Sequence, residues 1–333
     1  MPWSSRCARN VAAAKRRPRN IWLARLLAGL FVVGAAQAQT PPKPPARPAA
    51  APRVATPLVS LQKACELIGG RLQSVGVENC LNAGLRPSGG QSVNGLPILW
   101  RDFAPTSRKA TPRRILLIGG IHGDELSSVS TVFQWMKELE TKQDQAFYWR
   151  VAPCVNPDGM LLRPPTRVNA RGVDLNRNFM TPDWKSDALA YWENRTRKDP
   201  RRYPGPSPLS EPESRWLDEA IKAFRPDAIV SVHAPYGLLD YDGPAQAPEN
   251  FGYLHLHQLG TYPGSLGNYA GVYLGMPVIT LELPHAGIMP SSAQSQRIWN
   301  DMLQWLEKNL PKTEPALYQR LDDHPWNGGN EGR

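Results

Sequence analysis

Apolar residues in this chain gather into short runs that alternate with longer amphipathic segments. Short runs rich in Val, Ile and Leu indicate buried strands, whereas apolar positions repeating every three or four residues indicate helices that bury one face. The runs predict strands at 97–102, 114–119, 148–153, 227–233 and 277–283. The amphipathic segments predict helices at 125–140, 211–224 and 292–309. This alternation indicates an α/β fold.

Two of the predicted strands lead into side chains that can bind a metal ion. His122 and Glu125 follow the run 114–119, and His233 ends the run 227–233. A His-x-x-Glu spacing lets both side chains reach one ion from the same side, and two His with one Glu form a common catalytic zinc set. The alternative for the first pair is an exposed loop His beside a helix whose first turn favours acidic residues.

Glu282 is a carboxylate within the apolar run 277–283. Burial of an unpaired charge is costly, so this residue either forms a buried salt bridge or acts as a general base beside a metal. Its position at the end of a strand agrees with the usual location of active sites in α/β sheets, at strand ends and in the loops that follow.

The segment 167–179 is dense in Arg and Asn side chains. The planar guanidinium of Arg177, together with Asn176, can hold a terminal carboxylate, and Arg167 can polarise a carbonyl group. The alternative is a solvated polar loop without a ligand.

Five motifs in this order resemble the zinc carboxypeptidase family, and the resemblance covers about residues 95–310. They are His122-Gly-Asp-Glu125, Asn156-Pro-Asp-Gly159, Gly172-Val-Asp-Leu-Asn-Arg-Asn-Phe179, Ser231-Val-His233 and Thr280-Leu-Glu-Leu-Pro284. The resemblance implies a single catalytic domain with a mixed sheet flanked by helices.

The resemblance also implies a role for each residue of the metal centre. One zinc ion per chain would be bound by His122, Glu125 and His233. Glu282 would be the general base, and Arg167 would polarise the scissile carbonyl. The protein would therefore be a zinc-dependent peptidase.

Substrate binding is implied for three further residues. Asn176 and Arg177 would bind the carboxylate of the released residue, which makes such an enzyme an exopeptidase. The family has a mobile Tyr that closes over the substrate, and Tyr262 is the best match. Tyr269 is the other candidate, although a role in helix packing suits it better.

Within the family, the resemblance is greatest to bacterial peptidases of murein peptides. It implies a murein peptide substrate and cleavage of the γ-D-glutamyl-diaminopimelate bond. Asp240 and Asp242 follow the third ligand and are candidates to pair with the ammonium of diaminopimelate, the alternative being a solvated turn. Two other functions remain open. One is an N-acyl amino acid deacylase of the succinylglutamate desuccinylase or aspartoacylase type, and the other is an inactive homologue that binds the cell wall.

The first 38 residues have the parts of a secretory signal peptide. Basic residues precede an apolar run at 26–36, and a small-x-small site predicts cleavage after Ala38. The run is too short to span a bilayer, so no stable membrane anchor is expected. A Pro-rich and Ala-rich stretch at 39–57 predicts an extended linker. We therefore expect a periplasmic or secreted protein.

The formal net charge of +10 comes from this N-terminal region. Residues 1–57 contain ten Lys or Arg and no acid, which leaves 29 basic residues against 29 acidic residues in the rest of the chain. The globular part is therefore neutral, which argues against nucleic acid as a partner.

The remaining chain is predicted to have three parts. A small segment at 58–94 contains Cys65 and Cys80, which an oxidising compartment would allow to form a disulfide. The zinc peptidase domain is expected at 95–312. A polar tail follows at 313–333.

Overall fold

The computed structural model describes residues 59–106, 112–142, 146–244 and 246–310. The predicted signal peptide (1–38), the predicted linker (39–57) and the predicted polar tail (313–333) lie outside the described residues. Across the described ranges, no helix combines the length and the apolar character needed to cross a membrane.

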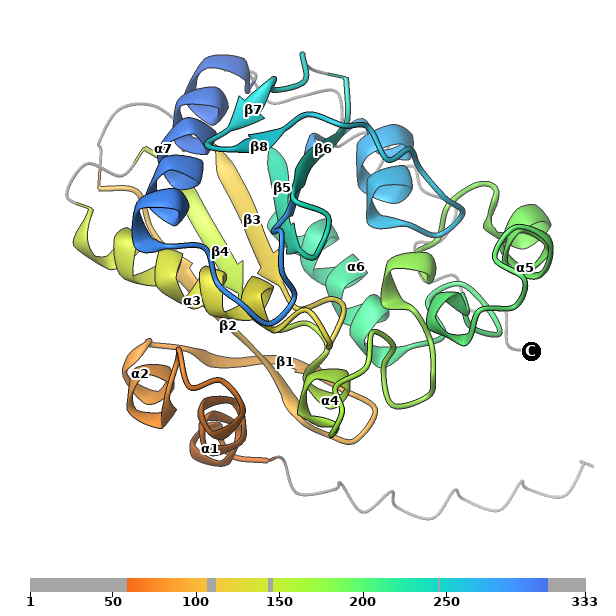
Figure 1. The fold of residues 1–333 in the computed structure, drawn as a ribbon, viewed down its shortest axis with the longest axis horizontal. Helices are drawn as coiled ribbons and strands as arrows, with labels where there is room; N and C mark the ends of the chain where they lie inside the picture. The colour runs from red at the N-terminus through yellow and green to blue at the C-terminus, as the bar shows by residue number, and fades with distance from the viewer. Residues whose placement is uncertain (1–58, 107–111, 143–145, 245, 311–333) are drawn as a thin grey trace, which may run out of the picture. The chain divides into compact units, whose positions relative to one another are not determined.

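A seven-stranded mixed sheet forms the centre of the described chain (Figure 1). Its strand order is β1, β2, β4, β3, β5, β9, β6. The four inner strands β4, β3, β5 and β9 are parallel, whereas β1, β2 and β6 run antiparallel to their neighbours. The strands are β1 (Arg86–Gln91), β2 (Pro97–Phe103), β3 (Arg114–Gly119), β4 (Tyr148–Ala152), β5 (Ala228–His233), β6 (Leu238–Asp242) and β9 (Val278–Glu282). A separate two-stranded ribbon is formed by β7 (Asn250–Phe251) and β8 (Leu254–His255).

Helices cover both faces of this sheet, so the predicted α/β fold with a mixed sheet flanked by helices is confirmed (Figure 1). Successive residues of a strand point to opposite faces, and both faces of the inner strands are apolar. On β3, Ile115 and Leu117 pack with α3 (Leu126–Thr141) and α7 (Ser292–Asn309). Leu116 and Ile118 pack on the other side with α6 (Pro212–Phe224) and the π-helical segment Gly267–Tyr273.

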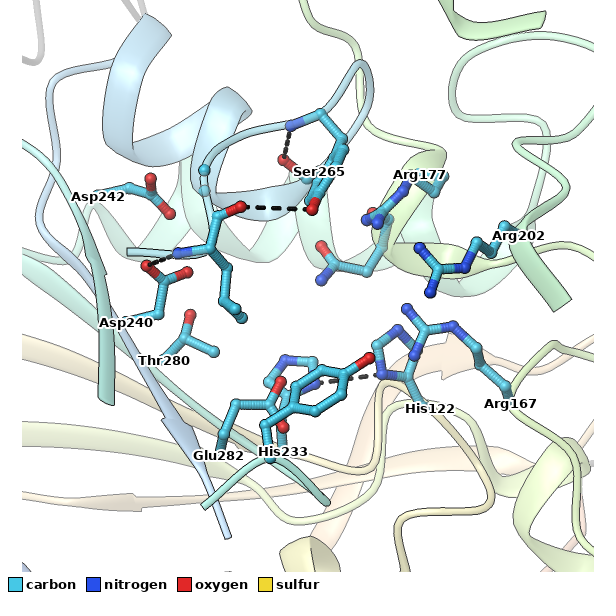
Figure 2. A pocket seen from close by; sticks show the side chains of 16 residues that line it. His122, Arg167, Arg177, Arg202, His233, Asp240, Asp242, Ser265, Thr280 and Glu282 are labelled. Atoms are coloured by element: carbon cyan, nitrogen blue, oxygen red, sulfur yellow. Dashed lines mark hydrogen bonds between the residues drawn. The ribbon is translucent and has the colours of Figure 1, made fainter. Parts of the chain in front are cut away.

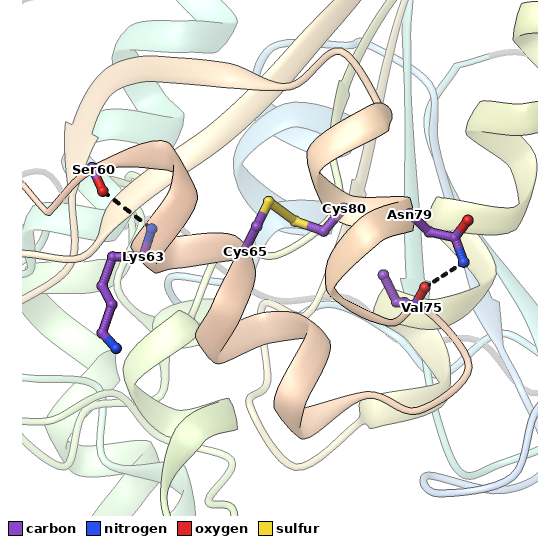
Figure 3. The surroundings of a disulfide bond; sticks show 6 residues. All are labelled: Ser60, Lys63, Cys65, Val75, Asn79 and Cys80. Atoms are coloured by element: carbon purple, nitrogen blue, oxygen red, sulfur yellow. Dashed lines mark hydrogen bonds between the residues drawn. A yellow bond between two sulfur atoms is a disulfide. The ribbon is translucent and has the colours of Figure 1, made fainter.

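The N-terminal helices α1 (Leu61–Arg71) and α2 (Val77–Asn82) are joined by a disulfide between Cys65 and Cys80 (Figure 3). Both cysteines are fully buried and belong to the same apolar cluster as α3. The strand that follows, β1, pairs with β2. The segment 59–94 is therefore joined to the rest of the described chain through the sheet and through a shared core.

The remaining helices are short and lie in the connections between β4 and β5. They are α4 (Pro157–Leu161), the 3-10 segment Leu175–Arg177, α5 (Trp184–Asn194) and the 3-10 segment Pro200–Arg202. Together with their loops they carry the Arg and Asn residues that the sequence singled out.

Candidate metal centre and substrate pocket

The residues predicted to bind metal come together because their strands are neighbours. Strand β5 lies between β3 and β9, and all three are parallel, so their carboxyl ends meet at one edge of the sheet. His233 is paired in register with Glu282, and His122 lies in the loop that leaves β3. This arrangement brings residues that are distant in sequence into one site.

The loop that carries His122 is held by close backbone packing. Gly120 has a φ of +58°, a conformation that favours glycine, and a Cβ on Gly123 would overlap the backbone of Gly159. The hydroxyl of Ser128, at the start of α3, accepts from the Gly120 N–H at 3.0 Å and donates to the Glu125 carbonyl at 2.6 Å. These contacts fix the turn from which both His122 and Glu125 project.

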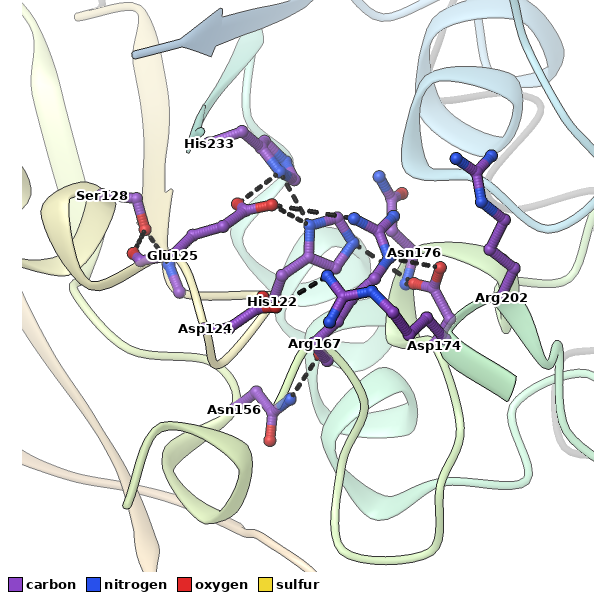
Figure 4. A network of polar contacts seen from close by, with 12 residues as sticks. His122, Asp124, Glu125, Ser128, Asn156, Arg167, Asp174, Asn176, Arg202 and His233 are labelled. Carbon is purple, nitrogen blue, oxygen red and sulfur yellow. Dashed lines mark hydrogen bonds and ion pairs between the residues drawn. The ribbon is translucent and has the colours of Figure 1, made fainter. Parts of the chain in front are cut away.

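Three buried side chains, those of His122, Glu125 and His233, converge beside this turn (Figure 4). Nδ1 of His122 lies 2.7 Å from Oε1 of Glu125, and Nδ1 of His233 lies 3.1 Å from Oε2 of the same carboxylate. The two Nδ1 atoms are 3.2 Å apart. One donor from each residue lies within 4.8 Å of the others.

The outward nitrogen of each ring has its own partner in the protein. Nε2 of His122 lies 3.2 Å from Oδ1 of Asp174, and Nε2 of His233 lies 2.9 Å from the hydroxyl of Ser231. An ionised carboxylate only accepts hydrogen bonds, so Asp174 places the ring proton of His122 on Nε2 and leaves a lone pair on Nδ1. Lone pairs directed at a shared point beside a carboxylate fit a zinc ion.

Charges around the centre shift the ordinary pKa values of its members. Burial and the charge of Arg167 lower the pKa of His122, but Glu125 and Asp174 outweigh them and the net shift is upward. Burial would raise the pKa of Glu125, yet the two imidazoles hold it well below its ordinary value. The acid of the set is therefore ionised and available as a ligand.

Glu282 lies beside the donor set and has a different environment. Its side chain is buried, and its Oε2 atom has no hydrogen-bond partner among the described residues. Burial raises the pKa of Glu282, and the charge of Glu125 adds to this effect, while His233 opposes it. A carboxylate with a raised pKa is a stronger proton acceptor than an ordinary carboxylate, which suits a general base beside a metal site.

Arg167 is anchored at the other side of the centre by three hydrogen bonds. Its Nε donates to Oδ2 of Asp174 at 3.0 Å, so this carboxylate orients both Arg167 and His122. Its backbone carbonyl accepts from the side chain of Asn156 at 3.2 Å and from the backbone of Gly123 at 3.2 Å. The Asn-Pro-Asp-Gly turn thereby holds Arg167 against the loop of the metal centre.

A cavity of about 160 Å³ opens next to the metal centre (Figure 2). Arg177 lines it, is almost fully buried, and places its guanidinium 4.2 Å from the centre of the Tyr262 ring. The side-chain oxygen of Asn176 accepts from the Leu266 N–H at 2.7 Å. The eight residues to which the sequence assigned metal binding, catalysis or carboxylate binding all lie at this site. Glu125 belongs to the donor set, and the cavity is lined by His122, Arg167, Asn176, Arg177, His233, Tyr262 and Glu282.

The two candidate tyrosines have different surroundings. Tyr262 is half-buried at the cavity, and its hydroxyl donates to the Leu259 carbonyl at 3.3 Å. Tyr269 is fully buried, stacks on Phe179 and donates to Asp218 at 2.6 Å. Tyr269 is therefore a core residue, and Tyr262 is the one of the two that a substrate can reach.

Sequence reasoning missed Asp174, Arg202, Tyr236 and Thr280. Arg202 and Tyr236 line the cavity from separate loops, and no pattern in the sequence indicates that these loops approach it. Asp174 could have been predicted from the sequence. It is the carboxylate within a segment of Arg and Asn residues, and a metal-binding His commonly donates a hydrogen bond to a carboxylate. Thr280 lies two residues before Glu282 on β9 and therefore projects from the same face of the strand.

Comparisons with known proteins agree with this site. Residues 87–243, which include His122, Glu125 and His233, match the family described as zinc carboxypeptidase. Murein peptide amidase A from Escherichia coli (strain K12) is 31% identical over 227 residues, which is 66% of this chain and 90% of that protein. The enzyme of the same name from Vibrio campbellii is 31% identical over 202 residues, or 59% of this chain and 77% of its own length. The chain therefore belongs to the zinc carboxypeptidase family and is a hydrolase of peptide bonds.

A solved structure agrees on the fold. Carboxypeptidase A from Helicoverpa armigera superimposes with a TM-score of 0.52 at 16% identity, covering 79% of this chain and 73% of that one. Membership of the family implies zinc, and the His122, Glu125 and His233 set fits it.

Proposed function

We propose that this protein is a zinc-dependent exopeptidase of murein peptides that cleaves the γ-D-glutamyl-diaminopimelate bond. The proposal is supported by the two relatives, which are both named murein peptide amidase A. The observation that carries it is the buried guanidinium of Arg177, which faces the cavity beside the metal centre. A buried guanidinium favours an anionic ligand, and a C-terminal carboxylate meets that need.

The residues of the site can each be given a step in the hydrolysis. Zinc, when bound, lowers the pKa of a water molecule and polarises a carbonyl group. Glu282 accepts a proton from the attacking water, and its raised pKa makes it a stronger proton acceptor than an ordinary carboxylate. Arg167 stabilises the negative charge that develops on the carbonyl oxygen. Glu282 then gives the proton to the departing amine, so the acid is regenerated as a base.

We also propose that the protein acts outside the cytoplasm, in the periplasm or after secretion. The signal-like sequence before Gln39 supports this location, and so does the pairing of Cys65 with Cys80, because disulfides persist in oxidising compartments. This proposal therefore places the enzyme and its murein peptide substrate in the same compartment. N-terminal sequencing of the exported protein tests the location, and a mature chain that starts near Gln39 is the expected result.

The substrate is tested with the purified zinc-loaded protein and the tripeptide L-alanyl-γ-D-glutamyl-diaminopimelate. We expect release of diaminopimelate, and much slower release from the same peptide with its terminal carboxylate amidated. Arg177→Ala is expected to lower kcat/KM about 10-fold to 100-fold on the free peptide, the scale of a hydrogen bond to a charged group, and to change the amidated peptide little.

Other outcomes would redirect the assignment. A clear preference for N-succinylglutamate over the tripeptide would identify a deacylase. Failure to cleave either compound with one zinc bound would indicate an inactive homologue. An equal effect of Arg177→Ala on the free and the amidated peptide would remove Arg177 from carboxylate recognition.

A further inference from the structure

The cavity next to the metal centre has positively charged side chains on one side and negatively charged side chains on the other (Figure 2). Arg167, Arg177 and Arg202 lie on one side of it, and Asp240 and Asp242 lie on the opposite side. A substrate that places its carboxylate on Arg177 therefore directs the rest of the released residue towards two acids.

The two acids project from an edge strand of the sheet. Strand β6 pairs with β9, and Asp240 is in register with Thr280, which also lines the cavity. The solvated turn considered for this segment is not what the structure shows, because residues 238–242 form a ladder with β9 along their whole length. Alternate residues of a strand share a face, so Asp240 and Asp242 are both presented to the cavity.

Each acid is fixed in place, and neither is paired with a Lys or Arg of the described ranges. Asp240 is 5% exposed, and its Oδ1 accepts from the Leu259 N–H at 3.1 Å. Asp242 packs against Gly267 and Gly271, where any Cβ would overlap its side chain. No Lys or Arg of the described ranges forms an ion pair with either carboxylate, and no hydrogen bond to the side-chain carboxylate of Asp242 is found within them.

Physical chemistry makes this pair unfavourable without a ligand. Burial raises the pKa of Asp240, and burial together with the charge of Asp240 raises the pKa of Asp242 to about 7. Buried acids are normally paired with a cation or bound by several donors. An ammonium group placed between them would supply the positive charge that no Lys or Arg of the described ranges supplies, and it would give the Asp242 carboxylate hydrogen-bond donors that these ranges do not.

We propose that Asp240, Asp242 and Thr280 form a subsite for an ammonium group at the far end of the released residue. The subsite rests on the proposed exopeptidase function, and it assigns to named residues the preference for a diamino acid as the released residue. Such a residue has a carboxylate for Arg177 at one end and an ammonium for the two acids at the other. Diaminopimelate has both groups.

The test compares two substrates that differ only in that amine. They are γ-D-glutamyl-diaminopimelate and γ-D-glutamyl-2-aminopimelate, assayed with the zinc-loaded protein. The wild type is expected to favour the first by about 10-fold to 100-fold in kcat/KM, the scale of charge-assisted hydrogen bonds. Asp240→Asn and Asp242→Asn should bring the ratio towards one by slowing the first substrate alone. Glu249→Gln removes an exposed carboxylate outside the cavity and should leave the ratio unchanged.

The outcomes separate this subsite from the proposed function. A wild-type ratio near one, with both substrates cleaved, would overturn the subsite and leave the exopeptidase in place. Equal slowing of both substrates in the variants would show a structural effect of the acids and would also overturn it. Calorimetry with free diaminopimelate and free 2-aminopimelate gives the same comparison without turnover. Equal affinities for the two would reject the subsite even in a protein that cleaves neither peptide.

Discussion

The two imidazoles of the metal centre are oriented by partners that take no part in binding the metal. Asp174 contacts Nε2 of His122, and Ser231 contacts Nε2 of His233, so the Nδ1 atoms of both rings face the same point. In each ring one nitrogen is held by the protein and the other is available to bind the metal. The expected effects of single substitutions on metal content follow from this arrangement.

Substitution of His233→Ala is expected to remove most of the bound metal. The variant loses one of three donors and leaves only His122 and Glu125. Metal analysis of the purified protein should fall from about one zinc per chain to well below that value. His285→Ala is the matched control, because His285 is exposed and lies outside the donor set. An unchanged zinc content in His233→Ala would remove the residue from the site.

Glu282→Gln separates proton transfer from metal binding. The amide keeps the shape of the side chain but cannot accept a proton, so turnover should fall by about 10²-fold to 10⁴-fold. Zinc content should stay at the wild-type level, because Glu282 is not one of the three donors. Loss of zinc together with activity would instead make Glu282 a ligand, and near-normal turnover would exclude it as the base.

At the scale of elements, the sequence predicts the inner strands and the long helices well. The apolar run at 114–119 coincides with β3, and the helix expected at 292–309 coincides with α7. Both elements are buried on the faces that their apolar residues define. For such elements the local sequence pattern is sufficient to predict the structure, because the spacing of the apolar residues reflects which face of the element is buried.

The edge strands could not be predicted in this way. The sequence of β1, Arg-Pro-Ser-Gly-Gly-Gln, has the composition of a loop, and it is a strand because β2 supplies a hydrogen-bonding partner. Strand β6 has acids on alternate positions that face a cavity rather than solvent. The position of Arg202 at the cavity could not be predicted either, because it depends on the path of the long connection between β4 and β5.

The disulfide between α1 and α2 is expected to stabilise the protein measurably. The two cysteines are 15 residues apart, and closing a loop of this length contributes about 3 kcal/mol in the chain-entropy account. Replacing Cys65 and Cys80 together by Ala should lower the free energy of unfolding by about that amount in urea titrations. Reductant should destabilise the wild type and leave the variant unchanged. A wild type that is insensitive to reductant would show that the bridge contributes little.

At the scale of the whole molecule, the buried acids Asp240 and Asp242 affect how the free energy of unfolding depends on pH. The pKa of Asp242 is raised from an ordinary value of 3.8 to about 7, chiefly by burial. Between these two values the folded state binds a proton that the unfolded state releases. This group therefore makes the free energy of unfolding fall as the pH rises from about 4 to about 7.

Asp242→Asn is expected to remove that contribution. Above pH 7 the variant should be more stable than the wild type, and the difference should shrink as the pH is lowered towards 4. Thermal unfolding of both proteins at pH 5, 6, 7 and 8 measures the difference in stability between them. The effect of pH on the metal centre is common to both proteins and cancels in this difference. A constant difference across this range would contradict the shifted pKa.

The position of β9 in the sheet determines when a growing chain can become active. This strand carries Glu282, the proposed base, yet it lies between β5 and β6, which are both synthesised before it. A nascent chain that has reached His233 already contains every donor of the metal centre but no proton acceptor. Until β9 is made, β5 and β6 each lack the neighbour that joins them into one sheet. An interrupted translation product that ends before β9 therefore lacks the proposed base, and on the proposed mechanism we expect peptide hydrolysis only after this strand has been inserted between β5 and β6.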